Sequence, residues 1–254
     1  MRRAHGNRIF EIKMMSLSKE WIEVSIASSG KGFVRELSNL LKKNNATDIL
    51  ECGCGGGHII YQLSKNGFNC IGIDLTKEMI DYAKQNYSNK NLEYLRLNWI
   101  NLNKLNKKFD SIICRGNSLV CGTSWEKSKE KFNSKEAEIF ISKSIKAMFN
   151  QLKENGLLYL DTISQREIDN DGGAIKIKTV NLDLKGKIEY DWEKRLRYMF
   201  GKGYVNKEYF EGNSTSYLIT PKELEKIVKF FKTKKVWFPN FKNETNYDII
   251  CAIK

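Results

Sequence analysis

The stretch that decides the fold is residues 49–58, Ile-Leu-Glu-Cys-Gly-Cys-Gly-Gly-Gly-His. A short apolar run ends there in a cluster of glycines, and residues 58–65 have the pattern of a helix that stops before Asn66-Gly67. Glycines at such a junction let the backbone come close to a ligand, and the first turn of a helix offers free N–H groups to an anion. The stretch therefore predicts a strand, a ligand-binding loop and a helix.

The same alternation of apolar runs and amphipathic segments continues after this loop. The runs at 68–74, 92–97, 109–114, 157–161, 236–238 and 247–253 predict further strands, and helices are expected after Thr76, over 135–152 and over 221–231. Strands and helices in this succession favour right-handed crossovers and a sheet covered on both faces. We expect a doubly wound, Rossmann-like α/β fold with a seven-stranded sheet, parallel except for an antiparallel last strand.

The rhythm breaks between residues 163 and 217, where period-two alternation at 175–180 predicts a strand. A turn is expected at 185–187, a return strand over 188–200 and a second turn at 201–203. We therefore expect residues 46–162 and 218–254 to form the cofactor-binding α/β domain and residues 163–217 an antiparallel insertion that lies over one end of its sheet and roofs the active site. Residues 1–45 are expected to form an N-terminal helical cap of two helices.

The composition excludes several classes of protein. No run of about 20 apolar residues is present, so no membrane association is expected, and no apolar segment follows the basic N-terminus as in a secretory signal. None of the six cysteines forms a Cys-x-x-Cys pair, and the chain has two histidines, so we expect no metal site. The cysteines favour buried free thiols and a cytoplasmic location. The net charge of +13 raises the chance of a polyanionic partner, but the basic pairs are spread along the chain, so a lysine-coated surface is favoured over nucleic-acid binding.

The chemistry-bearing residues lie at the ends of the first two strands. Asp74 follows the first glycine of the loop by about 20 residues, and a carboxylate there accepts hydrogen bonds from ribose hydroxyls. Dinucleotide-binding enzymes share this layout, but here His58 stands where their third glycine would be. Glu51 also precedes the first glycine, Gly53, by two positions. These two details favour a nucleotide-type binding site other than that of the dinucleotide-binding enzymes.

Residues 46–161 resemble the class I S-adenosylmethionine-dependent methyltransferases. Residues 51–57, Glu-x-Gly-x-Gly-x-Gly, match the first motif of that superfamily, with glutamate in place of the usual aspartate, and residues 72–79 match the second. The resemblance implies S-adenosyl-L-methionine as cofactor and S-adenosyl-L-homocysteine as product, with Asp74 on the ribose. The cofactor-binding residues implied by these two motifs are Glu51, Gly53, Gly55, Asp74, Leu75 and Met79.

Two shorter motifs are similar to those of glycine and sarcosine N-methyltransferases. They are Asn98-Trp99, implied to hold the adenine, and residues 114–119, in which Cys114 would contact the cofactor. Asn117 is implied to contact an amino-acid substrate beside the transferable methyl group, with Arg115 as a second catalytic candidate. Trp21 and Lys31 have the spacing of an N-terminal aromatic and basic pair that meets the cofactor in that family, with lysine in place of arginine.

One departure from this family concerns the substrate. The family places an arginine that grips the substrate carboxylate two residues after the acid that ends strand five. Here Asp161 is followed at that distance by Ile163, which cannot form a bidentate clamp. Either Arg166 or Arg115 replaces the arginine, or the substrate is not glycine.

The resemblance implies methyl transfer to the nitrogen of a small amine or amino acid. No histidine is expected near the methyl group, which suits an amine that loses its proton to water. Three alternatives stay open: S- or O-methylation of another small acceptor, methylation of RNA or protein, and a cofactor-binding subunit without turnover. The oligomeric state is left open.

Overall fold

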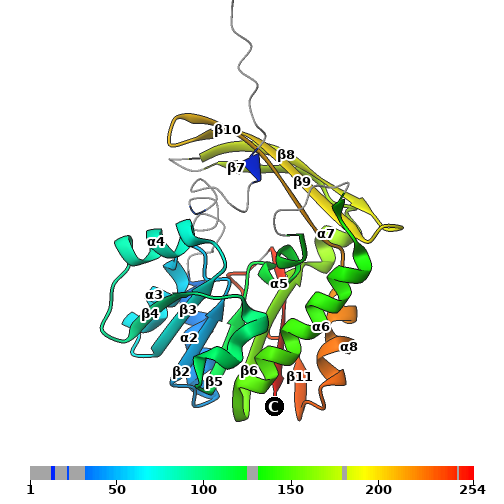
Figure 1. The fold of residues 1–254 in the computed structure, drawn as a ribbon. Helices are drawn as coiled ribbons and strands as arrows, with labels where there is room; N and C mark the ends of the chain where they lie inside the picture. Colours follow the sequence, from blue (N-terminus) through cyan, green and yellow to red (C-terminus); the bar gives the residue numbers. More distant parts are fainter. Residues whose placement is uncertain (1–12, 15–21, 23–31, 125–130, 179–181, 245) are drawn as a thin grey trace, which may run out of the picture.

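The computed structural model describes residues 13–14, 22, 32–124, 131–178, 182–244 and 246–254 (Figure 1). Its main sheet has seven strands in the order β11-β12-β6-β5-β2-β3-β4, and only β12 runs antiparallel to the others. The fold class predicted from the sequence is therefore confirmed. In that order the strands are β11 (Lys235–Trp237), β12 (Tyr247–Ile253), β6 (Leu152–Ile163), β5 (Phe109–Cys114), β2 (Asp48–Cys52), β3 (Asn69–Asp74) and β4 (Leu92–Arg96).

Helices cover both faces of this sheet. On one face lie α2 (Phe33–Lys43), α3 (His58–Lys65) and α4 (Lys77–Asn86), whose apolar side chains share one buried cluster with the sheet. On the other face lie α6 (Ser134–Gln151), α8 (Pro221–Phe230) and the 3-10 helix η2 (Trp99–Leu105), which form the second cluster. Burial of apolar surface in these two layers is the main force that holds the sheet together.

The N-terminal region departs from the expected pair of helices. Lys13–Met14 form a short strand, β1, which pairs in parallel with strand β10 of the insertion. Helix α2 buries Phe33, Leu37 and Leu41 completely in the cluster against the main sheet. Residues 32–43 thus pack as part of the α/β layers rather than as a separate cap, and most of residues 1–31 lie outside the described part of the chain.

The predicted antiparallel insertion is confirmed. Figure 1 shows it spread across the carboxyl ends of the main strands. The short helix α7 (Gln165–Asp169) leads from β6 into the insertion, and the short helix α5 (Ser118–Cys121), which follows β5, contacts its strand β10. We call this second sheet the roof. Its order is β1-β10-β9-β8-β7. Its long strands are β7 (Gly173–Lys178), β8 (Leu182–Asp191), β9 (Leu196–Val205) and β10 (Glu208–Tyr217).

The turns expected within the insertion were wrong. Gly186 and Gly201 lie in the middle of β8 and β9, directly opposite each other, and Gly203 lies further along β9. A Cβ atom at Gly186 would stand 2.1 Å from the carbonyl oxygen of Phe200, so only glycine allows this approach of two strands. The glycines serve the close packing of the strands, and the chain turns instead at residues 192–195 and 206–207.

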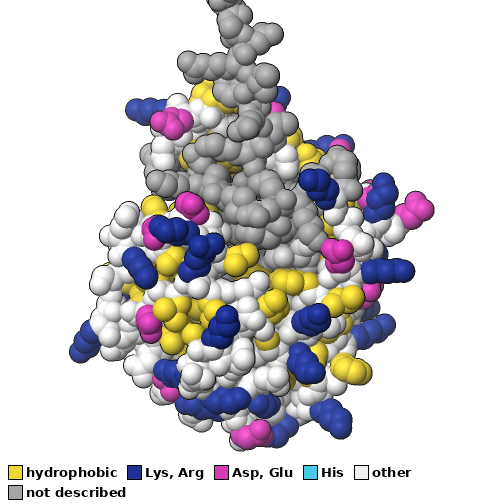
Figure 2. All heavy atoms as spheres, viewed as in Figure 1, with side chains coloured by type: hydrophobic (Ala, Val, Ile, Leu, Met, Phe, Trp, Pro, Cys, Tyr) yellow, Lys and Arg dark blue, Asp and Glu magenta, His cyan; other side chains and the backbone are white. Residues whose placement is uncertain are grey.

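The basic side chains on the face drawn in Figure 2 do not gather into one continuous stripe. That face shows Lys and Arg side chains spread over the domain, with hydrophobic and acidic side chains between them. Among the helices in the described part of the chain, none is long and apolar enough to cross a bilayer.

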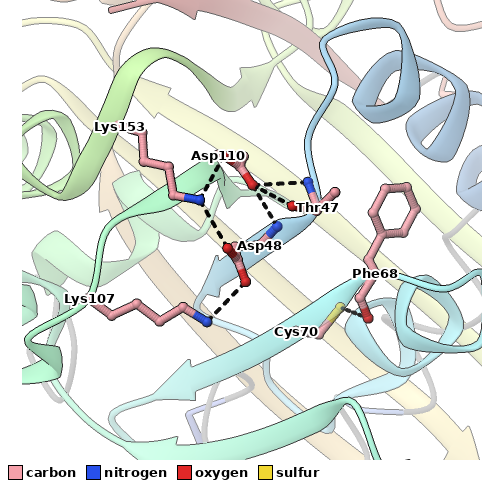
Figure 3. A network of polar contacts seen from close by, with 7 residues as sticks. All are labelled: Thr47, Asp48, Phe68, Cys70, Lys107, Asp110 and Lys153. Carbon is pink, nitrogen blue, oxygen red and sulfur yellow. Dashed lines mark hydrogen bonds and ion pairs between the residues drawn. The ribbon is translucent and has the colours of Figure 1, made fainter.

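A network of charges ties the amino ends of three strands together (Figure 3). Asp110 Oδ2 accepts hydrogen bonds from the backbone N–H of Thr47 at 3.1 Å and of Asp48 at 2.8 Å. Lys153 Nζ lies 2.9 Å from Asp110 and 3.0 Å from Asp48, which also pairs with Lys107. Partial burial opposes ionisation, but these partners outweigh it and lower the pKa of Asp110 to about 2.

This lowered pKa predicts an acid-sensitive contribution to stability. The contribution is present above about pH 4, the ordinary carboxyl range, and is lost as the pH falls through about 2. We expect Asp110→Asn to lower the free energy of unfolding at pH 7 by about 1–2 kcal/mol and to flatten its fall in acid. Urea unfolding at pH 7 and pH 3 measures both. The control is Asp81→Asn, whose carboxylate pairs with Lys77 on an exposed helix face; a loss as large in this control would contradict the prediction.

Candidate active site

A cavity of about 580 Å³ lies between the carboxyl edge of the main sheet and the roof. Its floor comes from the loops that follow β2, β3, β4 and β5, and its upper wall from β7, β8, β9 and β10. The crevice outside the carboxyl ends of parallel strands is the usual ligand site of open α/β sheets. The cavity therefore joins the loop quoted first above with residues from the insertion.

The glycine loop after β2 needs its glycines for two different reasons. Gly53, Gly55 and Gly57 all have positive φ, at 74°, 51° and 82°. A Cβ atom at Gly57 would stand 2.6 Å from the hydroxyl of Tyr94, whereas one at Gly55 would meet no atom within 4 Å. Packing against β4 requires Gly57, while the backbone at Gly55 is open to the cavity.

Asp74 ends β3 and holds the glycine loop. Its Oδ2 accepts the backbone N–H of Gly55 at 3.0 Å, and its Oδ1 accepts that of Thr76 at 2.9 Å. Burial raises the pKa of Asp74, although both hydrogen bonds favour the ionised form. A carboxylate has about four acceptor positions, and Asp74 lines the cavity, so a ligand donor can also reach this side chain. Leu75 and Met79 line the cavity beside it.

Glu51, near the end of β2, is 2% exposed, and the structure shows no hydrogen-bond partner for its Oε2 among the described residues. Burial raises the pKa of Glu51 to about 8, while the charge of Arg115 opposes this shift. Arg115 is itself buried, with its guanidinium 4.8 Å from the ring centre of Phe33 and with Asp161 as the acid that most favours its charge. A buried carboxyl with a partnerless oxygen calls for a donor from a ligand.

Asn98 and Trp99 lie at the start of η2 and line the cavity. Asn98 Oδ1 accepts the backbone N–H of Ile100 at 3.0 Å and so caps the helix. The indole Nε1 of Trp99 donates to Ser144 Oγ on α6 at 3.1 Å. The indole N–H is therefore used within the protein, which leaves the ring and the backbone of Trp99 and the amide nitrogen of Asn98 for a ligand.

Asp161, at the carboxyl end of β6, fixes the turn that carries Asn117. Its two oxygens accept the backbone N–H groups of Gly116 at 2.9 Å and Asn117 at 2.7 Å. Burial raises the pKa of Asp161 to about 7, and the charge of Arg115 opposes this shift. Asn117 has a left-handed backbone, with φ 58°, and its Oδ1 accepts the hydroxyl of Thr162 at 3.3 Å.

The structure brings most of the predicted site residues to one cavity. Those that line it are Glu51, Gly53, Gly55, Asp74, Leu75, Met79, Asn98, Trp99, Arg115 and Asn117. Cys114 does not: its side chain is fully buried in the cluster beneath the sheet. Trp21 and Lys31 lie outside the described residues, although Ile22, next to Trp21, lines the cavity beside Gly56.

The substrate-clamp candidates lie in different places. Arg115 is at the cavity wall, Arg166 is exposed on α7 and is not part of the lining, and Ile163 is buried away from it.

The sequence predicted an insertion over the active site, but not which of its charged side chains reach the cavity. Arg197 on β9 reaches the cavity and forms two hydrogen bonds to Glu167 of α7, from Nε to Oε1 at 2.7 Å and from Nη2 to Oε2 at 3.3 Å. The hydroxyl of Tyr190 donates to the same Glu167 Oε1 at 2.7 Å. Tyr190 and Arg197 both fell inside the single strand expected over 188–200, whereas the chain turns at residues 192–195 and places the two residues opposite each other on paired strands. Tyr247, at the start of β12, and Cys121 also line the cavity unforeseen.

Comparison with known proteins decides the family. The profile of the methyltransferase domain family matches residues 43–209. The chain belongs to this family. The match covers the glycine loop, Asp74 and the Gly116-Asn117 turn, so the resemblance to class I methyltransferases stated from the sequence is confirmed at the level of the family.

The methyltransferase domain has relatives with named activities. The chain is 27% identical over 187 residues to a glycine/sarcosine N-methyltransferase of Parasynechococcus marenigrum. The aligned region covers 70% of this chain and 60% of that protein. It is 30% identical over 145 residues to the enzyme of the same name from Halorhodospira halochloris, covering 56% of this chain and 47% of the relative. The chain thus spans about half to three fifths of the length of these curated relatives.

A solved structure shares the fold across nearly the whole chain. It is an S-adenosylmethionine-bound amino pentose methyltransferase from Micromonospora echinaspora, with a TM-score of 0.69 and 13% identity, and the match covers 93% of this chain and 97% of that one.

The glycine loop yields a prediction about stability. Gly57→Ala introduces both left-handed strain and a clash with Tyr94, whereas Gly67→Ala, at φ 94° with no atom within 4 Å, introduces strain alone. We expect losses of about 1 kcal/mol for Gly67→Ala and about 2–4 kcal/mol for Gly57→Ala, measured by urea unfolding. Equal losses in the two variants would show that the contact with Tyr94 relaxes freely.

Proposed function

We propose that this protein is an S-adenosylmethionine-dependent methyltransferase that transfers a methyl group to the nitrogen of a small amine. The observation that carries the proposal is the shared cavity: Glu51, whose Oε2 has no hydrogen-bond partner among the described residues, the anchored Asp74 and the turn at Asn117 line it together. Membership of the methyltransferase domain family supports the reaction class, and the names of the two N-methyltransferase relatives support nitrogen as the acceptor atom.

The residues at the floor of the cavity fit the parts of this cofactor. Glu51 offers its partnerless oxygen to the cationic amine of the methionine part, and a cation there would bring its raised pKa down again. The remaining acceptor positions of Asp74 suit the ribose hydroxyls. Asn98 and Trp99 stand next along the edge of the sheet, where an amide donor and an aromatic ring suit the adenine.

The chemistry asks for positioning more than for acid–base catalysis. In the reaction the neutral amine nitrogen forms a bond to the methyl carbon while the carbon–sulfur bond breaks, its electron pair stays on sulfur as a thioether, and the amine proton passes to water. Asn117, held by Asp161 and Thr162, presents its amide beside the acceptor part of the cavity and orients the amine. His58 belongs to the glycine loop, where burial lowers its pKa, and we give it no role as base.

Asp74→Asn tests the cofactor assignment. Replacement of one carboxylate oxygen by an amide nitrogen removes an acceptor for a ligand hydroxyl and sets a donor against a backbone N–H. We expect titration calorimetry to show an affinity for S-adenosyl-L-homocysteine about 10–100-fold lower than that of the unsubstituted protein, with the control Asp81→Asn unchanged. Unchanged affinity in Asp74→Asn would contradict the ribose assignment, and no binding to the unsubstituted protein would refute the proposed cofactor.

Asn117→Gly tests the acceptor side. Glycine keeps the left-handed backbone at this position, so the turn on Asp161 is retained while the amide is lost. We expect kcat/KM for the amine to fall by about tenfold or more while the affinity for S-adenosyl-L-homocysteine stays within about twofold. A parallel loss of both quantities would mean that Asn117 supports the cofactor rather than the acceptor.

A further inference from the structure

We propose that the acceptor is an amine carried on an apolar body without a carboxylate, and that the roof binds this body. The inference rests on the proposed function and names its substrate class. It departs from glycine and sarcosine, the substrates in the names of the relatives. Two features of the cavity carry it: the apolar side chains that the roof turns inward, and the pairing of Arg197 in the wall with the protein's own Glu167.

The inward face of the roof is apolar over three strands. Ile175 and Ile177 of β7, Ile188 of β8 and Met199 of β9 all line the cavity. Ile188 and Met199 are direct cross-strand partners, so their side chains lie on the same face of the sheet. Both are buried and belong to one apolar cluster, which the two β7 residues cover. A ligand in the cavity would therefore meet a hydrocarbon surface above it, bordered by Arg197, which lies on the same face of β9 as Met199.

The guanidinium groups of the wall already have partners within the protein. Arg197 is engaged by both oxygens of Glu167, and Tyr190 donates to one of these oxygens as well. Arg115 lies over the ring of Phe33, with its guanidinium 4.8 Å from the ring centre. Ile163, where the related enzymes place their clamp, is buried away from the cavity.

The two lysines that border the cavity belong to the other face of β7. Lys178 and Lys176 alternate with Ile177 and Ile175 along the strand, and Lys178 pairs with Asp183. Among the described residues, Arg197 and Lys178 could therefore bind a substrate carboxylate only by giving up their ion pairs with Glu167 and Asp183.

These features set the preference between two acceptors. Burial of an unpaired carboxylate in such a site is strongly unfavourable, whereas an amine must be neutral when it attacks and an apolar wall favours its neutral form. An apolar body gains affinity with each methylene that it buries. The site should therefore reject an amino acid and accept the amine that corresponds to it without the carboxyl group.

The experiment compares three matched pairs with the full chain and S-adenosyl-L-methionine: methylamine and glycine, isopentylamine and leucine, and phenethylamine and phenylalanine. Formation of S-adenosyl-L-homocysteine gives kcat/KM for each. We expect the amine to exceed its amino acid by about tenfold or more within the two larger pairs, and isopentylamine to exceed methylamine by a similar factor. Equal or better use of the amino acids would overturn the inference and leave N-methylation intact. Binding of S-adenosyl-L-homocysteine without turnover of any of the six would refute the proposed N-methylation, and the inference with it.

A pair of variants on one strand tests the role of the roof. Ile188 and Leu184 are both 4% exposed and lie on the same face of β8 in the same apolar cluster, but only Ile188 lines the cavity. We expect Ile188→Ala to raise KM for isopentylamine by about tenfold and Leu184→Ala to leave it within about twofold, with unchanged affinity for S-adenosyl-L-homocysteine in both. The same KM in both variants would show that the acceptor body does not lie on the roof.

Discussion

Two buried carboxylates at the carboxyl edge of the sheet hold the loops on which the site depends. Asp74 accepts backbone N–H groups from Gly55 and Thr76, and Asp161 accepts those of Gly116 and Asn117. Each carboxylate loses hydration by burial and is stabilised by backbone donors that only the folded loop supplies. The loops are thereby fixed to rigid strands, which is what precise placement of a ligand requires.

Beside these two anchors, a buried carboxyl and a buried guanidinium have a different role. Glu51 and Arg115 are both buried, and each shifts the ionisation of the other. A buried carboxyl with a partnerless oxygen is a poor source of stability, because desolvation is compensated only in part. Its place at the cavity floor gives it a binding role, since a cationic ligand group would complete its contacts. Glu51 therefore destabilises the protein without a ligand, and a bound cationic group would supply the missing contact of its Oε2.

The roof converts an open edge into an enclosed cavity and is joined to the main domain at three places. Arg197 binds Glu167, Arg195 pairs with Glu223 of α8 at 2.7 Å, and Tyr217 donates its hydroxyl to Glu138 of α6. Arg195 and Arg197 lie at the start of β9 and Tyr217 at the end of β10, and these two ends pair with each other, so the contacts hold the roof at one end of its strands. The apolar inner face of the roof is therefore kept above the glycine loop and the turn at Asn117.

The local pattern of the chain was sufficient for the main sheet and for the floor of the cavity. Apolar runs ending in glycine or in an acid mark the ends of parallel strands, and the carboxyl ends of such strands meet at one edge; the place of Asp74 and Asn117 in the cavity lining was therefore predictable. The roof was not predictable in detail, because Gly186 and Gly201 look like turn residues until their partner strands are known. Cys114 was predicted to contact the cofactor, but its side chain does not line the cavity. It points from β5 into the apolar cluster between the sheet and helices α6 and α8. The pairing of Arg197 with Glu167, which sets the charge of the upper wall, joins residues 30 positions apart and was decided only by the tertiary structure.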